Sequence, residues 1–180
     1  SWGYDNLNSG YVILLTDMEH NSNIIPWQII CKKTGAKIKY IRSTENGTID
    51  LEDLKKSLDS NVKIVSITHA SNVFGTINPV KEITSIVKKN GSKIMIDGCQ
   101  SIPHMKVNVK DLDCDFYAFS GHKMFGPTGV GVLYGKEEIL EEMQPYQTGG
   151  GIIETVTMTE STWTSIPHKF EPGSPMACLL

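Results

Sequence analysis

Short apolar runs alternate along the chain with segments that mix apolar and charged residues. The apolar runs, such as "KIVSIT" and "KIMID", carry few polar residues on either face. That pattern is typical of strands in a parallel sheet that helices cover on both sides. We predict strands at residues 12–16, 36–41, 63–68, 93–97, 115–120 and 130–134.

The segments between the strands carry signals for the start and end of helices. Asp50 has the character of an N-cap residue. Asn78-Pro79 places a proline at the first helical position of another helix, and Asn90-Gly91 places a glycine just past its end. We predict helices at residues 22–33, 51–58, 79–90 and 136–142.

Strand–helix alternation of this kind predicts an α/β fold. The expected architecture has three layers, with a mainly parallel sheet, helices on both faces and right-handed crossovers. At 180 residues the chain is long enough for one domain with a core of its own. It shows no internal repeat, no low-complexity segment and no convincing linker before about Gln147.

Composition narrows the classes of partner. The chain is 39% hydrophobic and 21% charged, with a net charge of −3, as in ordinary globular proteins. The basic residues between Lys32 and Arg42 are interleaved with apolar ones and indicate a solvated face, so no nucleic-acid partner is predicted. No apolar run reaches about 18 residues, so no membrane span is predicted either.

The four cysteines form neither a CxxC pair nor a compact disulfide framework. Reduced thiols in a reducing compartment are therefore expected, in the cytoplasm or in an organelle such as a plastid or mitochondrion. Cys99, His104 and Cys114 lack the spacing of metal ligands, so no metal site is predicted.

Polar side chains follow several predicted strands at the point where each strand ends. These segments are residues 17–20, 69–76, 97–100 and 120–123. Because the carboxyl ends of parallel strands meet at one edge of a sheet, all four segments should border one ligand site. In the last of them Lys123 follows Ser-Gly-His and precedes a glycine-rich run, where glycine lets a ligand or the backbone come close. The sequence thus predicts that Lys123 faces a ligand.

The glycine-rich run does not fit a nucleotide motif. From Gly129 its spacing is GxGxxxG, one residue too long for the dinucleotide fingerprint, and "GVLYGKE" has Glu137 where a P-loop needs Ser or Thr. The combination of Lys, Asp, His and small hydroxyls is what pyridoxal 5'-phosphate (PLP) needs. A lysine amine condenses with its aldehyde, an acid keeps the ring nitrogen protonated, a flat side chain covers the ring, and hydroxyls hold the phosphate.

Four motifs carry a resemblance to a known family. In order and spacing, "TDMEHNSNIIPWQ", "THASNVFGT", "MIDGCQS" and "FSGHKMFGPTGVGVLYG" resemble the cysteine desulfurases of class V, in particular the SufS-like branch that includes selenocysteine lyases. The resemblance covers essentially the whole chain, through "FEPGSP". It implies the PLP-dependent transferase fold type I. Residues 1–180 would be the central part of the PLP-binding large domain, without the N-terminal segment and the C-terminal small domain.

The resemblance also implies roles for individual residues at the cofactor. Lys123 matches the lysine that forms the Schiff base, and Asp97 matches the acid that pairs with the ring nitrogen. Gln100 and Asn72 match groups that hydrogen-bond the phenolic oxygen, and His20 matches the histidine stacked on the ring. For Asp97 and His20 a simple helix-capping role is the alternative, and for Gln100 and Asn72 it is ordinary loop chemistry.

Further matches concern the phosphate and the mouth of the site. Ser120 and His122 match phosphate contacts beside the lysine. Ser174 stands where the family has a Thr whose hydroxyl reaches the phosphate of the neighbouring subunit, which implies a homodimer. "TGGG" at residues 148–151 resembles a flexible loop near the active-site mouth, with a plain linker as the alternative.

The implied activity removes sulfur from L-cysteine, or selenium from L-selenocysteine. The products would be L-alanine and an enzyme persulfide, which a sulfur-acceptor protein takes up for iron–sulfur cluster assembly. In the family the persulfide cysteine and a substrate-binding arginine lie in later segments that this chain does not match, so the chain alone is expected to be inactive. Cys99 is interpreted as a packing residue.

Two alternatives of other classes remain open. One is another class V enzyme, such as an aminotransferase or a kynureninase-like hydrolase, against which "SGHK" and "THASNVFGT" together argue. The other is a non-catalytic protein on the same fold, since a fold does not fix a function. The presence of both Lys123 and Asp97 argues against that alternative.

Overall fold

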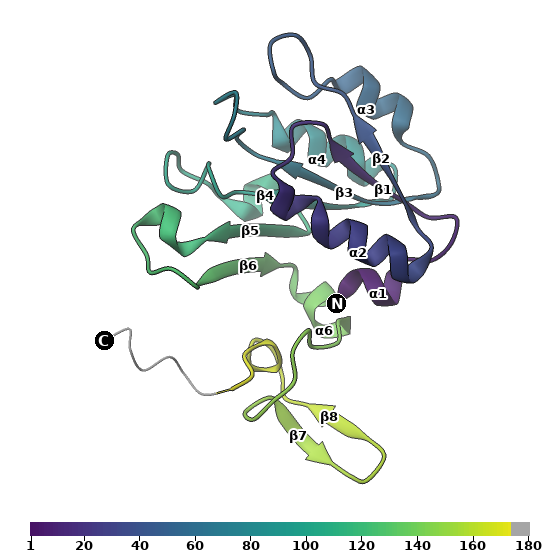
Figure 1. Ribbon diagram of the computed structural model, residues 1–180, viewed down its shortest axis with the longest axis vertical. Coiled ribbons are helices and arrows are strands. Elements are labelled where there is room, and N and C mark those ends of the chain that lie inside the picture. The colour runs from purple at the N-terminus through teal and green to yellow at the C-terminus, as the bar shows by residue number, and fades with distance from the viewer. Residues whose placement is uncertain (174–180) are drawn as a thin grey trace. The chain divides into compact units, whose positions relative to one another are not determined.

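The computed structural model describes residues 1–173 (Figure 1). Within it the chain forms two compact units. The larger unit is Asn6–Lys136, and the smaller one combines residues 1–5 with the chain from Glu137 onward. The larger unit contains the main sheet and all of the predicted strand-end residues.

The larger unit is built on a six-stranded sheet with the order β2-β1-β3-β4-β5-β6. Strands β1 to β5 are parallel, and β6 runs antiparallel to β5. Each predicted strand is present with bounds that agree within one residue. The strands are Val12–Thr16 (β1), Lys37–Ile41 (β2), Val62–Thr68 (β3), Lys93–Asp97 (β4), Phe116–Ser120 (β5) and Gly131–Gly135 (β6).

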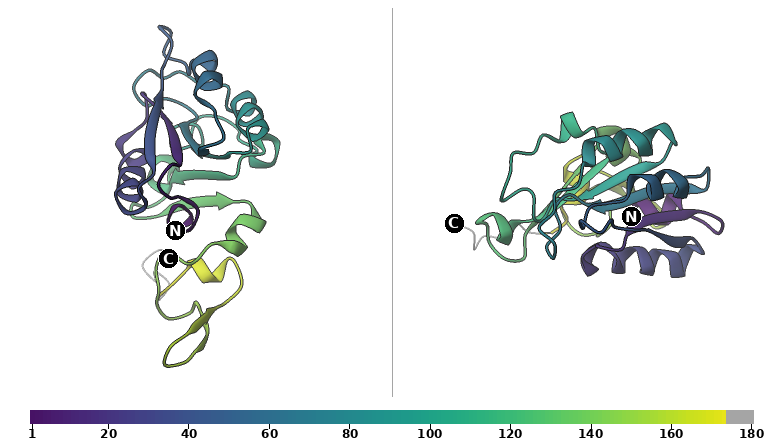
Figure 2. Two further views of the ribbon diagram at one scale, coloured as in Figure 1. Left: turned by 90° about the vertical axis from the view of Figure 1, so that its right-hand side faces the viewer. Right: turned by 90° about the horizontal axis from the view of Figure 1, so that it is seen from above.

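Helices cover both faces of this sheet, which confirms the predicted three-layer α/β fold. Helix α2 lies on one face, and α3 and α4 lie on the other (Figure 2). The α-helices of this unit are Ile25–Thr34 (α2), Leu51–Ser57 (α3), Val80–Lys89 (α4) and Val109–Leu112 (α5), and two 3-10 helices are Asn21–Asn23 (η1) and Gly121–Met124 (η2).

Local sequence explains where these helices begin and end. Asp50 caps α3 as predicted, because its carboxylate accepts hydrogen bonds from the main-chain N–H groups of Glu52 and Asp53. Pro79 is the N-cap of α4 rather than its first residue, one position earlier than predicted. The helix expected over residues 22–33 is split into η1 and α2, because Pro26 near the start of α2 has no N–H with which to continue a helix from the preceding turn.

The core of the larger unit lies between the sheet and the α3–α4 layer. Strand β3 is buried along nearly its whole length, as its apolar run predicts. Leu54 of α3 and Ile83 and Val87 of α4 pack with strand residues such as Val65 and Ile94, and all five are fully buried. This packing holds the sheet rigid and so fixes where the loops leave its carboxyl edge.

The smaller unit has elements that the sequence analysis mostly did not anticipate. Helix α6 spans Glu137–Glu142, within one residue of the prediction. The hairpin of Ile153–Val156 (β7) and Ser161–Trp163 (β8), the 3-10 helix His168–Phe170 (η3) and the first helix Trp2–Asn6 (α1) were not predicted. Within residues 1–173 no helix combines the length and apolar character needed to cross a membrane.

Candidate active site

The order of the strands marks where a ligand site should lie. From β1 the chain moves outward to β2 and then returns past β1 to β3, so the direction of winding reverses between β1 and β3. In open parallel sheets ligands bind at the carboxyl ends of the strands beside such a reversal. The segments that follow β1, β3, β4 and β5 therefore border one edge of the sheet, as the sequence predicts.

Asp97 is the last residue of β4 and is held by its neighbours on both sides. Its main-chain carbonyl accepts a hydrogen bond of 2.9 Å from the N–H of His69, which follows β3. The next N–H, of Gly98, donates to the carbonyl of Ala118 in β5 at 2.8 Å. The half-buried carboxylate accepts from the N–H of Cys99 at 2.9 Å. The position of this acid is therefore fixed by β3, β5 and its own turn.

A buried polar cluster lies beneath the Asp97 turn. The hydroxyl of Tyr117 is 2.6 Å from the hydroxyl of Ser101 and 2.8 Å from Nδ1 of His69. Burial raises the pKa of Tyr117 to about 12 and lowers the pKa of His69, so both side chains are neutral at pH 7. The ring of Tyr117 also explains Gly98, because a Cβ there would lie 2.0 Å from its Cε1 atom.

Lys123 lies in η2, directly after β5, and is half-buried. The hydroxyl of Ser120 is 3.5 Å from the sulfur of Cys99, which brings this segment beside the turn that follows Asp97. Gly126 closes the turn after the lysine, where a Cβ would meet the carbonyl oxygen of Gly121 at 2.9 Å. The glycine in this segment therefore allows a tight turn that places Lys123 at the sheet edge.

His20 lies on the loop after β1, and its ring is exposed. Its Nδ1 is 3.2 Å from the N–H and 3.0 Å from the hydroxyl of Ser22, so it caps η1. Nδ1 of His20 thus has the helix-capping role that was the alternative to stacking. The predicted stacking role concerns the face of the ring and is compatible with this capping.

The side chains of the remaining predicted residues have fewer contacts that fix their positions. Asn72 is exposed on the loop after β3, and His122 is exposed on η2. Gln100 is half-buried, and its main-chain carbonyl accepts a hydrogen bond from Nδ1 of His104 at 2.7 Å. Ser174 lies outside the described residues. The ligand contacts assigned to these residues stay predictions.

Glu19 is a buried acid that the sequence analysis did not single out. One carboxyl oxygen accepts from the N–H of Thr68 at 2.9 Å and from the hydroxyl of Thr16, and the other accepts from the side-chain amide of Asn23 at 2.7 Å. Burial raises the pKa of Glu19 to about 7, and the nearby charge of Asp97 acts in the same direction. The available signal was an acid directly before His20 and three residues after the end of the apolar strand β1.

The cysteine thiols described by the structure are poor nucleophiles. Burial raises the pKa of Cys31 and of Cys99, and it raises the pKa of Cys114 to about 11. Because the thiolate is the reactive form, burial lowers the reactivity of these three side chains near neutral pH. Within residues 1–173 no three His, Cys, Asp or Glu side chains converge as a metal site.

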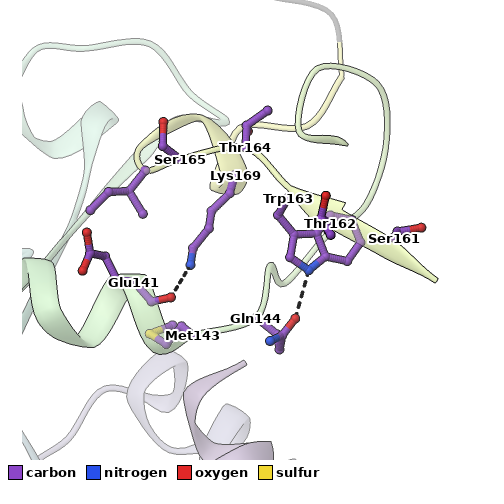
Figure 3. A pocket seen from close by; sticks show the side chains of 10 residues that line it. Glu141, Met143, Gln144, Ser161, Thr162, Trp163, Thr164, Ser165 and Lys169 are labelled. Carbon is purple, nitrogen blue, oxygen red and sulfur yellow. Dashed lines mark hydrogen bonds between the residues drawn. The ribbon is translucent and has the colours of Figure 1, made fainter. Parts of the chain in front are cut away.

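A separate pocket of about 460 Å³ lies within the smaller unit (Figure 3). The ammonium group of the buried Lys169 donates to the carbonyl of Glu141 at 2.8 Å, and the indole N–H of Trp163 donates to Gln144 at 3.0 Å. None of the predicted site residues lines this pocket, so it is not the strand-end site.

The geometry defines a class of protein: α/β proteins with a mainly parallel sheet, in which a lysine and an acid lie at the carboxyl ends of adjoining strands. Comparison with known families identifies the family within this class. The sequence model of the Aminotransferase class-V family matches residues 1–179. The chain belongs to this family.

Individual relatives confirm the resemblance to cysteine desulfurases. The chain is 53% identical over 176 residues to a probable cysteine desulfurase of Halalkalibacterium halodurans, a match that covers 98% of this chain and 43% of the relative. It is similar to the cysteine desulfurase CsdA of Escherichia coli, with a TM-score of 0.94, 35% identity, and 97% and 44% of the two chains covered. The chain thus spans less than half the length of the relatives it matches.

One similar solved structure contains the expected cofactor. It is a C-DES mutant with glycine covalently linked to the PLP cofactor, and it matches with a TM-score of 0.83 and 28% identity over 96% of this chain and 49% of its own. PLP therefore occurs in a protein of this fold.

Replacing Gly98 with alanine should destabilise the larger unit. The added Cβ would overlap the ring of Tyr117, which cannot move without breaking its hydrogen bonds to Ser101 and His69. We expect a loss of about 2–3 kcal/mol in the free energy of unfolding, as for other overpacked cores. Urea denaturation measures this loss. Gly150→Ala, at a glycine with open space around it and without a positive φ, serves as the steric control.

Replacing Glu19 with glutamine should remove a pH dependence of stability. The folded-state pKa of about 7 exceeds the reference value of 4.5, so the folded protein holds an extra proton between these pH values. Relative to Glu19→Gln, the free energy of unfolding of the wild type should fall by up to about 3 kcal/mol as the pH rises from 4.5 to 7, and then level off. Urea denaturation of both proteins from pH 4.5 to 8 tests this. If the difference in the free energy of unfolding between the two proteins did not change with pH, the pKa of Glu19 would not be raised in the folded protein.

Proposed function

We propose that this chain is the central part of the PLP-binding large domain of a cysteine desulfurase. The enzyme would remove sulfur from L-cysteine and leave L-alanine and an enzyme persulfide, which supplies iron–sulfur cluster assembly. The observation that carries the proposal is the placement of Asp97, the last residue of β4, and Lys123, just after β5, at one edge of the sheet. The 53% identity to a probable cysteine desulfurase supports it.

The residues at this edge fit PLP. Asp97 is a half-buried acid whose position three neighbouring segments fix, as an acid that faces a ring nitrogen must be. Lys123 is presented by a tight glycine turn, and the hydroxyl of Ser120 lies at the same place. When bound, the cofactor supplies an electron sink for the carbon attached to the amino group of the substrate.

Each residue of the chain would then have one task. The carboxylate of Asp97 holds a proton on the ring nitrogen, and the amine of Lys123 holds the cofactor covalently. The flat ring of His20 covers the cofactor. Asn72 and Gln100 hydrogen-bond the phenolic oxygen, and the phosphate is bound by Ser120, His122 and, from a second subunit of a homodimer, Ser174.

The sulfur would leave the substrate for a cysteine other than the three described ones. The raised pKa values of Cys31, Cys99 and Cys114 keep these thiols protonated near neutral pH. The fourth cysteine, Cys178, lies outside the described residues. Because the resemblance puts the persulfide cysteine in a later segment, we place the persulfide on a cysteine outside this chain, from which a sulfur-acceptor protein would take it.

Lys123→Ala should abolish covalent attachment of PLP in the complete protein. The amine of Lys123 is the group proposed to condense with the aldehyde, and alanine cannot replace it. Borohydride reduction followed by mass spectrometry should show the cofactor attached to the wild type and absent from the variant. Lys106→Ala, at an exposed lysine outside the sheet edge, should keep the attachment. Cofactor attached to Lys123→Ala, together with turnover, would refute the assignment.

Asp97→Asn should keep much of the cofactor binding and lower the rate of alanine formation by several orders of magnitude. An amide cannot hold the ring nitrogen protonated as a carboxylate does, so the electron sink is lost. Turnover of L-cysteine, normalised to bound PLP, measures the effect. Near-normal turnover in this variant would remove Asp97 from the mechanism.

A further inference from the structure

Two buried side chains tie the loop that carries His20 to strand β3. Glu19, directly before His20, accepts a hydrogen bond from the main-chain N–H of Thr68 at 2.9 Å. Asn23, three residues after His20, accepts one at 2.7 Å from the hydroxyl of Ser66 on the same strand. Glu19 and Asn23 are also joined to each other at 2.7 Å. The exposed His20 therefore lies between two anchored positions.

We propose that Glu19 is a positioning residue, whose carboxyl group holds the loop of His20 at the carboxyl end of β3. The anchoring itself is independent of what the site binds. Its consequence, that the ring of His20 is kept at the place where PLP would lie, rests on the proposed function.

The contacts of His20 explain why its loop needs an anchor. The hydrogen bonds of its ring are made to Ser22, two residues away, and Ser22 is exposed. Such local contacts set the ring relative to η1 but not relative to the sheet. One link to the sheet runs through Glu19, which joins the loop to Thr68 across 49 positions of sequence, and a second runs from Asn23 to Ser66. Without the carboxyl group of Glu19, the side of the loop that precedes His20 would lose its bond to β3, and Asn23 would lose the acceptor for its amide.

The same link reaches the acid of the site. Thr68 is paired in register with Asp97 on β4, so Glu19 binds the backbone of a residue directly beside Asp97. Burial raises the pKa of Glu19, and the charge of Asp97 adds a smaller effect in the same direction. A protonated Glu19 near neutral pH would leave the negative charge at this edge on Asp97, where a ring nitrogen would use it.

Substitutions at Glu19 can distinguish the effect of its hydrogen bonds from the effect of the volume that its side chain fills in the core. Alanine removes both carboxyl oxygens and leaves the N–H of Thr68, the amide of Asn23 and the hydroxyl of Thr16 without this acceptor. Glutamine keeps one oxygen for Thr68 and a similar volume. Asp115→Asn is the matched control, because Asp115 is a buried carboxylate that bonds the N–H of Ile94 at the opposite end of β4.

Hydrogen exchange on the cofactor-free complete protein tests the anchoring. In Glu19→Ala we expect amide exchange in a peptide covering residues 17–24 to rise about tenfold or more, as for the loss of one buried hydrogen bond. Glu19→Gln should stay within about threefold of the wild type, since it keeps the bond to Thr68. Asp115→Asn should leave this peptide unchanged. Unchanged exchange in Glu19→Ala, or an equal rise in Asp115→Asn, would overturn the proposal.

Cofactor binding tests the consequence. We expect the dissociation constant for PLP to rise about tenfold in Glu19→Ala, with a change in visible absorbance, but not in Asp115→Asn. A loosened loop with unchanged affinity and absorbance would overturn the positioning role. Failure of the wild type to bind PLP through Lys123 would instead refute the proposed function, and the exchange result would still decide whether Glu19 anchors the loop.

Discussion

The site depends on how the backbone is held where β4 ends. The carbonyl of Asp97 and the N–H of Gly98 extend the sheet's hydrogen bonding to both neighbours, toward His69 on one side and Ala118 on the other. A backbone bonded on both sides has little freedom, so the Asp97 carboxylate leaves the sheet in one direction. Gly98 is required there because the ring of Tyr117 occupies the space where a side chain would begin. The acid is thus placed by main-chain bonds and aromatic packing together.

Two buried polar clusters support this edge, one centred on Tyr117 and the other on Glu19. Such clusters are costly unless every member has a partner, and within residues 1–173 no buried side-chain nitrogen or oxygen lacks one. An apolar core could give similar stability, since replacing buried polar groups by well-packed apolar ones is often neutral or better. The polar clusters add orientation of the loops, because each hydrogen bond fixes the position of one loop relative to one strand.

Much of this arrangement could be predicted from the sequence, and the limits have physical reasons. Strands β1 and β3 were predictable because burial on both faces leaves an apolar run. The ends of β4 and β5 then placed Asp97 and Lys123 at one edge. Glu19 and Tyr117 were missed because their partners are distant in sequence, as Glu19 and Thr68 are. The β7–β8 hairpin was missed because Ile153–Val156 is exposed throughout and lacks the alternation of a half-buried strand.

Two side chains with nucleophilic groups, the thiol of Cys99 and the amine of Lys123, lie in the segments at this edge. Cys99 lies between Asp97 and Ser120: its N–H donates to the Asp97 carboxylate at 2.9 Å, and its sulfur is 3.5 Å from the Ser120 hydroxyl. Burial is the main cause of the raised pKa of its thiol; the hydrogen bond to Ser120 opposes this rise, and the charge of Asp97 adds to it. The acid that would hold a proton on the cofactor therefore also helps keep the adjacent cysteine protonated. Under the proposed function, covalent attachment of the cofactor at this edge would therefore fall to the amine of Lys123.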